Sequence, residues 1–277
     1  MKNVDDDVVR GFGEEWQRFD QRELSRDELA TMFESYFRIF PWDKLPPNAE
    51  GFDLGCGSGR WAMFVAPRVG RLHCVDASAD ALNVARRNLG AFSNCEFHNA
   101  TVDAMPLPAA SLDFGYSLGV LHHIPDTAAG IEACVAKLKP GAPFLLYLYY
   151  ALDNKPRWYR MIWKTSELLR GVLSRSPRFL RHLGAEIAAA TLYFPLARLA
   201  LLLEKLGMNV ESFPLSFYRH RSYYVMRTDA LDRFGTRLEK RFTREQITSM
   251  MTRAGLRDIT FSDQPPYWCA VGVKSAP

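Results

Sequence analysis

The sequence lacks the features of disulfide-stabilised, metal-thiolate and exported proteins. Its 277 residues contain five cysteines, an odd number, with no Cys-x-x-Cys pair. We therefore expect neither a disulfide framework nor a thiolate metal site, and we predict no bound metal. The N-terminus carries Asp5, Asp6 and Asp7 where a signal peptide has a basic and then an apolar segment. These absences predict a protein of the reducing cytoplasm.

A long uncharged apolar run is also missing. The longest apolar stretch, residues 183–206, is interrupted by Glu186, Pro195, Arg198 and Glu204, whereas a spanning helix needs about 20 largely uncharged residues. We therefore expect no membrane span. Repeats and low-complexity segments are absent too, and the content of 48% hydrophobic and 24% charged residues excludes disordered and fibrous classes. The length fits one large domain, or one domain with an insertion.

Charge is nearly balanced over the whole chain but unevenly placed along it. The formal net charge is only +4. Residues 151–185 nevertheless hold eight lysines and arginines against Asp153 and Glu167. This segment is strongly basic, and the rest of the chain is slightly acidic, so the segment needs a separate interpretation.

Short apolar runs alternate with helical patterns between residues 50 and 150. This alternation is typical of βαβ units and a parallel sheet. Near the C-terminus, Thr243 and Gln246 form a capping box that begins a helix ending at Gly255. The predicted strands are residues 51–54, 71–76, 95–98, 112–117, 143–150, 256–262 and 267–273, and the predicted helices between the first five include 78–89 and one through 131–138.

Residues 151–210 show only helical periodicity, punctuated by glycine and proline. We interpret this segment as a helical insertion after the fifth strand. The aromatic and arginine-rich segment 218–227 that follows is expected to be extended. The predicted organisation is an N-terminal helical cap at 1–47, a core at 48–150 and 227–277, and an inserted lid at 151–226.

A glycine-rich loop follows the first predicted strand. In Asp53-Leu-Gly55-Cys56-Gly57-Ser-Gly59, the glycines permit a tight turn and a close backbone approach to a ligand. Asp76 ends the next strand, 21 residues after Gly55, where a carboxylate can accept hydrogen bonds from ribose hydroxyls. The spacing GxGxG differs from the dinucleotide pattern GxGxxG. We therefore expect an adenosine-type cofactor without a pyrophosphate.

Five ordered motifs resemble those of the class I S-adenosylmethionine-dependent methyltransferases. They are DLGCGSGRWA, CVDAS, NATVDAMPLP, LDFGYSLGVLHHIPD and LKPGAPFLLY. The resemblance covers residues 50–150 and extends to the closing helix and two strands. It implies an α/β, Rossmann-like seven-stranded sheet with helices on both faces and an antiparallel last strand. It also implies S-adenosylmethionine as the cofactor.

The resemblance further implies the cofactor-binding residues. Asp53 and the loop of Gly55, Cys56, Gly57 and Gly59 would hold the methionine part. Asp76, with Ala77 beside it, would bind the ribose. Asp103 and Ala104 would contact the adenine, and Leu118 and Gly119 would line the sulfonium. The segment Phe12-Gly-Glu-Glu-Trp16 is similar to leading helices that close over the cofactor in family members, although packing on the core explains Trp16 equally well.

Two groups are candidates for acceptor chemistry. His122 and His123 follow the fourth strand at the ligand-binding edge, and an imidazole titrates near neutrality, so either could act as a general base. The same histidines could instead pack the loop. Tyr223, in the aromatic and basic segment that runs to Arg233, could contact the acceptor, or could belong to a solvated, partly packed connection.

Three interpretations of the basic and apolar insertion stay open. It is a lid over the acceptor pocket, which we favour, a homodimer interface, or a peripheral membrane contact through residues 155–206. The expected function is methyl transfer to nitrogen or oxygen of a small-molecule acceptor, with no nucleic-acid partner. The alternatives are a tRNA or other RNA methyltransferase, a non-catalytic cofactor-binding or membrane-associated assembly module, and, with least support, an NAD-dependent dehydrogenase.

Overall fold

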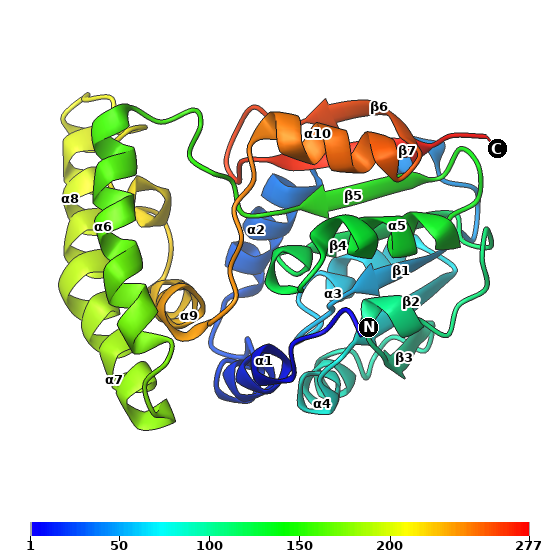
Figure 1. Cartoon of the computed structure of the whole chain (residues 1–277), viewed down its shortest axis with the longest axis horizontal. Helices are drawn as coiled ribbons and strands as arrows, with labels where there is room; N and C mark the ends of the chain where they lie inside the picture. Colours follow the sequence, from blue (N-terminus) through cyan, green and yellow to red (C-terminus); the bar gives the residue numbers. More distant parts are fainter. Residues whose placement is uncertain (1, 277) are drawn as a thin grey trace. The chain divides into compact units, whose positions relative to one another are not determined.

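The computed structural model describes residues 2–276, which divide into two compact units. The core unit comprises Ser25–Ala151, the residues before Arg22 and those after Arg237. The helical unit comprises Leu152–Arg237 together with Arg22–Leu24. Each unit has its own buried apolar cluster, and Figure 1 shows the sheet in one unit and a group of helices in the other.

The core unit contains one seven-stranded sheet of order β3-β2-β1-β4-β5-β7-β6. The first five strands run parallel, and β7 pairs antiparallel with both β5 and β6. This confirms the predicted fold class, including the antiparallel last strand. The strands are β1 (Glu50–Leu54), β2 (Arg71–Asp76), β3 (Cys95–Asn99), β4 (Phe114–Leu118), β5 (Pro143–Tyr147), β6 (Leu256–Phe261) and β7 (Cys269–Lys274).

The central strands are apolar because both faces of the sheet are covered. All five residues of β4 and four of the five in β5 are buried. Helices α5 and α10 contact each other on one side, while α4 packs on β2 and β3 and carries α1 against it (Figure 1). The helices of this unit are α1 (Asp6–Arg18), α2 (Arg26–Phe37), α3 (Ala62–Val65), α4 (Ala79–Asn88), α5 (Thr127–Lys137) and α10 (Arg244–Arg253), with 3₁₀ turns η1 (Trp42–Lys44), η2 (Ala66–Arg68), η3 (Val102–Ala104) and η4 (Leu121–His123).

Local capping explains where two of these helices begin. The Ser78 hydroxyl accepts a hydrogen bond from the Ala81 amide at the start of α4. Thr243 and Gln246 form the predicted reciprocal capping box at the start of α10. Gly255, with φ of +88°, follows the last residues of that helix, a position that favours glycine because a Cβ would be strained there.

The helical unit has no strand among its described residues. It consists of α6 (Arg157–Leu173), α7 (Arg178–Ala188), the π-turn η5 (Ala189–Tyr193), α8 (Phe194–Lys205), the 3₁₀ turn η6 (Ser216–Tyr218) and α9 (Tyr223–Gly235). The helical nature predicted for 151–210 is thereby confirmed. Small residues dominate its buried cluster, which is formed by Ala188, Ala189, Tyr193, Ala197, Met226, Ala230 and Phe234.

The expectation of an extended segment at 218–227 is wrong. Residues 216–218 form η6, and α9 begins at Tyr223. The Ser222 hydroxyl accepts a hydrogen bond from the Val225 amide and so caps this helix. Tyr224, Val225 and Met226 are then buried. Aromatic and β-branched residues suggested a strand, but the cap and the burial of one helix face decide the structure.

The two ends of the insertion meet within the core unit. The Ala151 amide donates a hydrogen bond to the Phe242 carbonyl over 2.9 Å, and Tyr150 forms a parallel bridge with Phe242. The unit boundaries lie at 151/152 and 237/238. The predicted boundary at 226/227 falls inside α9, and almost all of the predicted cap at 1–47 lies in the core unit.

Large apolar side chains are exposed in the helical unit only, among the residues described. Leu168 is 75% exposed and Phe179 74% exposed. The full set is Trp158, Met161, Ile162, Leu168, Leu169, Val172, Phe179, Leu180, Leu183, Ile187, Leu192, Phe194, Leu199, Leu202, Leu206, Met208 and Tyr223.

One continuous helix within that unit passes the length and hydropathy test for crossing a membrane. Arg178–Lys205 spans 28 residues, and an 18-residue window in it has a mean hydropathy of 1.5. Several of its charged side chains are nevertheless bound within the unit. Glu186 forms a two-pronged ion pair with Arg227 over 2.8 Å, and Arg198 donates to the Arg219 carbonyl over 2.9 Å.

Candidate active site

The glycine loop after β1 has a conformation that only glycine adopts readily. Gly55, Gly57 and Gly59 have φ values of +74°, +55° and +78°. The Gly55 amide donates to the Val75 carbonyl at the end of β2 over 2.7 Å, and the Cys56 amide donates to the same oxygen over 3.1 Å. The loop is therefore fixed to the carboxyl edge of the sheet, where open α/β folds bind ligands.

Asp76 connects this loop to the end of β2. One carboxylate oxygen accepts from the Gly57 amide over 2.9 Å and the other from the Ser78 amide over 2.8 Å. Burial raises the pKa of this carboxyl, and the two amides oppose that shift. Ala77 is held beside it, since its carbonyl accepts from the Asn99 amide group over 2.9 Å. The acidic residue predicted from spacing thus lies against the glycine loop.

Asp53 is a buried carboxyl with an unsatisfied oxygen. The residue is 1% exposed, and its Oδ2 has no partner of good hydrogen-bond geometry among the described residues, although the buried Tyr116 hydroxyl is close to this carboxyl. Burial raises the pKa of Asp53 to about 8. A carboxylate costs much free energy in such a position unless a cation or donor accompanies it. Asp53 is therefore a place where a bound ligand would supply the missing partner.

The end of β4 leaves open space beside the same edge. Leu118 is buried, while Gly119 has φ of +82° and a Cβ built there would meet no atom within 4 Å. The Gly119 amide donates to the Tyr147 carbonyl over 3.0 Å, which fixes the backbone. This residue thus offers a rigid backbone with room next to it, as the predicted sulfonium contact requires.

Asp103 and Ala104 lie in η3, after β3, and both are exposed. A hydrogen bond from the Thr101 side chain holds the pKa of Asp103 below its usual value. The Asn3 amide donates to the same carboxylate over 3.5 Å, at the limit of hydrogen bonding. The structure therefore places an ionised, accessible carboxylate near the end of β3, and its contact with an adenine stays a prediction.

Trp16 reaches the glycine loop from α1. A Cβ added to Gly57 would lie 2.9 Å from the Trp16 indole, so the ring packs directly on this glycine. The Arg60 guanidinium lies 5.3 Å from the same ring. The leading helix thus covers the loop, which fits both a closing role over a cofactor and simple packing.

His122 and His123 are buried in η4 and stack in an aromatic group. Their ring centroids are 4.0 Å apart, and the His122 ring lies 3.9 Å from the Tyr149 ring. His122 is fully buried, neither ring nitrogen has a hydrogen-bond partner, and burial holds its pKa well below the usual value. It is therefore neutral at pH 7 and has a lone pair available, but no open route to solvent.

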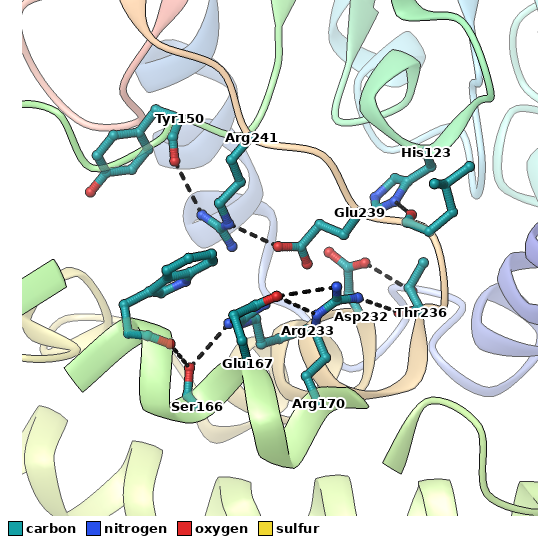
Figure 2. Close-up of polar contacts among 12 residues, drawn as sticks. His123, Tyr150, Ser166, Glu167, Arg170, Asp232, Arg233, Thr236, Glu239 and Arg241 are labelled. Atoms are coloured by element: carbon teal, nitrogen blue, oxygen red, sulfur yellow. Dashed lines mark hydrogen bonds and ion pairs between the residues drawn. The ribbon is translucent and has the colours of Figure 1, made fainter. Parts of the chain in front are cut away.

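A segment missed by the sequence reasoning holds these histidines. The His123 Nδ1–H donates to the Leu238 carbonyl over 2.7 Å, and the Lys240 amide donates to the His122 carbonyl over 3.1 Å. Arg241 pairs with Glu239 over 2.8 Å (Figure 2). The signal was weak, since residues 238–242 carry no motif. These contacts favour the packing interpretation of His123 and fix which ring nitrogen carries the proton.

Tyr223 is not shown to join this group, because it belongs to the helical unit. It is 38% exposed and contacts the Phe194 ring edge to face at 5.7 Å. Its neighbours in the predicted acceptor group are used inside that unit. The Tyr218 hydroxyl donates to Asp229 over 2.9 Å, and Arg227 binds Glu186. Acceptor binding by Tyr223 stays a prediction. Arg227 is a weaker candidate, because its guanidinium is already bound by Glu186.

The comparisons with known proteins agree with this geometry. Residues 52–141 match the family model described as "Methyltransferase domain". The core unit has the class I methyltransferase fold, and residues 52–141 within it resemble a methyltransferase domain. Enzymes of this class use S-adenosylmethionine as methyl donor, and the resemblance of the five motifs is confirmed. The match begins within β1 and ends before β5, so it includes the glycine loop, Asp76 and both histidines.

Relatives of the methyltransferase domain resemble parts of this chain. The ubiquinone biosynthesis O-methyltransferase of Methylocella silvestris is 29% identical over 41% of this chain and 47% of its own length. The chain thus spans about half the length of most of the curated relatives it matches. A SAM-dependent methyltransferase structure from Thermotoga maritima has a TM-score of 0.50 and 14% identity, covering 95% of this chain and all of its own.

A further solved structure is similar over nearly the whole chain. It is a chain of the complex between the Haloferax volcanii Trm112 methyltransferase activator and a methyltransferase, with a TM-score of 0.51 and 14% identity. The likeness covers 96% of this chain and 98% of that one. At this identity the likeness shows the fold.

Proposed function

We propose that this chain is an S-adenosylmethionine-dependent methyltransferase acting on a nitrogen or oxygen of a small-molecule acceptor. The observation that carries the proposal is the junction of Gly57 and Asp76 at the carboxyl edge of the sheet, beside the unsatisfied Asp53 carboxyl. Burying the Asp53 carboxyl without a full set of partners costs free energy, and a bound ligand would offset that cost.

The residues present fit S-adenosylmethionine. Its ammonium group is the kind of partner that Asp53 Oδ2 lacks, and it would lower the raised pKa of that carboxyl. Each Asp76 oxygen accepts one amide hydrogen and keeps a second lone pair for a ribose hydroxyl. Gly119 leaves room where the sulfonium would lie. When bound, the cofactor supplies a methyl group that departs with loss of positive charge at sulfur.

The protein positions the acceptor and the methyl group. It also needs a general base if the acceptor atom carries a proton. Alignment of acceptor and methyl group can supply roughly 7–11 kcal/mol. A protonated acceptor oxygen or nitrogen also needs a proton acceptor, worth about 10²–10⁴-fold in rate. His122 is neutral and carries an available lone pair, so it is the better placed of the two histidines. It needs a local opening to reach an acceptor.

Two substitutions separate a base from a packing residue. If His122 is the base, His122→Gln lowers kcat by at least about 100-fold with an unchanged cofactor Kd. His123→Gln tests the same role for the second ring. Near wild-type kcat in both variants, with normal unfolding curves, would remove the histidines from the chemistry.

The acceptor class is supported by the curated relatives. They include ubiquinone biosynthesis O-methyltransferases by name, which act on a small molecule. We extend this class to our chain, together with an acceptor-selecting lid role for the helical unit, a cytoplasmic location and the absence of a nucleic-acid partner. A homodimer is a further proposal.

One labelling experiment tests the activity and the acceptor together. The protein is incubated with methyl-labelled S-adenosylmethionine and an extract of its source cells, and the products are separated into small molecules, lipids, RNA and protein. We expect label in small molecules or lipids, and less label with Asp76→Ala at a cofactor concentration near the wild-type Kd. Label in RNA would replace our acceptor class. Cofactor binding without label in any fraction would favour the non-catalytic module.

A further inference from the structure

The outer face of α6 combines an apolar stripe with basic residues along its border. Met161, Leu168 and Val172 are 68–75% exposed and recur at intervals of seven and four residues, which places them on one side of the helix. Lys164 follows Met161 by three residues and precedes Leu168 by four, and Arg157 precedes Met161 by four. Both basic residues are exposed.

Acidic residues are turned away from this face. Residues 155–200 contain two glutamates, Glu167 and Glu186. Glu167 is bound inside the unit by Arg170 and Arg233, as Figure 2 shows. Burial raises the pKa of Glu167, but the two guanidinium groups outweigh it and hold the pKa below its usual value. Glu186 is bound by Arg227. The exposed charge beside the stripe is therefore positive.

We propose that the helical unit docks on an anionic lipid bilayer, with α6 lying in the plane of the headgroups. A helix with an apolar stripe and basic borders buries the stripe among acyl chains while its cations contact lipid phosphates. This proposal concerns the helical unit alone and stands without methyl transfer.

A second copy of the chain is a poorer occupant for this surface. Residues 155–206 hold ten lysines and arginines against three glutamates. Two such faces would bring like charges together, which disfavours pairing. A spanning orientation is also disfavoured for Arg178–Lys205, because it would carry the Glu186–Arg227 ion pair into the hydrocarbon. The buried alanines Ala188, Ala189 and Ala197 pack that helix against α9, which leaves only its other side exposed.

Vesicle flotation of the full chain tests this proposal. The probes are vesicles of phosphatidylcholine alone and of phosphatidylcholine with about one-third phosphatidylglycerol, at about 0.1 M and 0.5 M salt. We expect recovery with anionic vesicles at low salt, and a partition coefficient at least about tenfold lower with neutral vesicles or at high salt.

Two variants locate the contact. Arg157→Gln/Lys164→Gln removes two positive charges beside the apolar stripe. Leu168→Ser/Val172→Ser removes apolar surface at positions that are mostly exposed, so little internal packing is lost. Each should lower partition at least about fivefold. The matched control, Arg86→Gln/Arg87→Gln, removes two exposed arginines from α4 in the core unit and should change partition less than twofold.

Three results would overturn the docking proposal. Equal recovery with neutral and anionic vesicles excludes an anionic surface, and equal loss in the α4 control places the contact elsewhere. A dimer in light scattering that Leu168→Ser/Val172→Ser converts to a monomer makes the face a protein interface. Protein that stays with vesicles through high salt and alkaline extraction is inserted across the bilayer and not docked on it.

A separate cluster in the core unit has the composition of a metal site. His73, Glu96 and His98 lie on β2 and β3, where the parallel register pairs His73 with Glu96 and Val75 with His98. Their side chains therefore share one face at the edge of the sheet, and the three ligand atoms lie within 4.8 Å of one another. His73 Nδ1 is 3.0 Å from His98 Nε2 and 3.4 Å from Glu96 Oε2.

A second carboxylate orients His73 for such a role. Its Nε2 lies 2.8 Å from Glu50 Oε1, so this nitrogen carries the proton and Nδ1 presents a lone pair toward His98 and Glu96. We infer that these three residues bind a divalent transition metal such as Zn²⁺, contrary to the expectation of no metal. Two imidazoles and a carboxylate suit this class. Arg71 contacts Glu50 and Glu96 and must release Glu96 for binding.

Cobalt absorption, with competition by Zn²⁺, tests the metal site on the full chain. We expect one equivalent of Co²⁺ to give visible absorption and Zn²⁺ to displace it, with affinity about 10–100-fold lower in His98→Ala and Glu96→Gln. The control His220→Ala removes an exposed histidine that also pairs with a carboxylate, Glu204, and should not change the affinity. No cobalt spectrum in the wild type, or equal affinity in His98→Ala with a normal unfolding curve, would refute the site.

Discussion

The two units bury their apolar side chains in different ways. In the core unit, Leu145 and Phe144 of β5 and Phe114 of β4 are fully buried between helices that cover both faces of the sheet. In the helical unit the buried cluster consists largely of alanines, and residues such as Leu168 are exposed. Helices on both faces of a sheet bury its apolar side chains completely. In a single layer of helices, one side of a helix stays exposed and is available to contact a partner or a membrane.

This difference separates two functions. The features that fit a cofactor, namely the glycine loop, Asp53 and Asp76, are all within the core unit. The helical unit contributes surface and charge. We therefore expect cofactor binding and acceptor handling to be separable by substitution, and four predictions test this in order of decreasing effect.

Replacing residues 152–237 by a short glycine and serine linker should abolish turnover and preserve cofactor binding. The linker has little distance to cover, because the Ala151 amide already contacts the Phe242 carbonyl. We expect turnover on the natural acceptor to fall by at least about 10³-fold, since positioning is lost. Cofactor Kd from calorimetry should stay within about threefold of the full chain, a difference below 1 kcal/mol.

Retained turnover in this deletion variant would end the lid proposal. A variant that unfolds cooperatively but fails to bind cofactor would show that the core unit needs the helical unit to bind it. The division of functions between the two units would then be wrong.

Asp76→Ala should weaken S-adenosylmethionine binding by roughly 1–3 kcal/mol, about 5–150-fold. The substitution removes the acceptor for ribose hydroxyls and also the anchor of the Gly57 amide. Calorimetric titration measures the effect. The exposed Asp263→Ala serves as the control, with no expected change, and an unaltered Kd in Asp76→Ala would refute the cofactor placement.

Stability without ligand should decrease between pH 7 and pH 9 because of Asp53. Its folded-state pKa of about 8 lies above the ordinary value of 3.8, so the folded state holds a proton that the unfolded state has lost. The stabilising effect is complete below the ordinary value and disappears as pH rises through about 8. We expect wild type to lose about 1 kcal/mol more than Asp53→Asn over this range.

Urea unfolding at pH 7, 8 and 9 measures this dependence. His122 acts in the opposite direction, because its lowered pKa removes stability only as pH falls below the ordinary value of 6.5. The buried cysteines Cys134 and Cys269, whose pKa values burial raises above 9.0, lose stability toward pH 9 in both proteins, so the difference between wild type and Asp53→Asn isolates Asp53. If the free energy of unfolding changes with pH equally in wild type and Asp53→Asn, the buried carboxyl is already paired.

Leu168→Ser should change the free energy of unfolding by less than about 0.5 kcal/mol, since its side chain is 75% exposed. Leu145→Ala in the core unit should cost about 2–5 kcal/mol, because its side chain is fully buried. Urea unfolding compares the two. A large loss for Leu168→Ser would show that this face is already covered in solution, and would remove the contrast between the units.

Local patterns in the sequence were sufficient for the sheet and the cofactor loop. The first two apolar runs end near Gly55 and Asp76, and one βα unit fixes the spacing between these residues. Residues close together in the sequence were therefore enough to predict this part of the site. The helix α9 was missed because the aromatic residues before Met226 favour a strand locally. The Ser222 cap and the burial of Met226, Ala230 and Phe234 in one cluster favour the helix instead.

Contacts between distant residues could not be predicted. The partner of His123 is the Leu238 carbonyl, 115 residues away, and no motif marks that segment. The cluster of His73 and His98 depends on strand register, which sequence periodicity alone leaves open. Glu96 and His98, two residues apart, gave a partial signal, since such residues share one face of a strand.

The hydrogen bond from the Gly57 amide to Asp76 is made within the chain and fixes the glycine loop. Ordering a flexible loop normally reduces affinity, because its conformational entropy is lost on binding. Here that loss has already occurred during folding. Cofactor affinity in this protein is therefore coupled to fold stability, and a substitution that loosens the β1–β2 edge would weaken binding without touching the ligand.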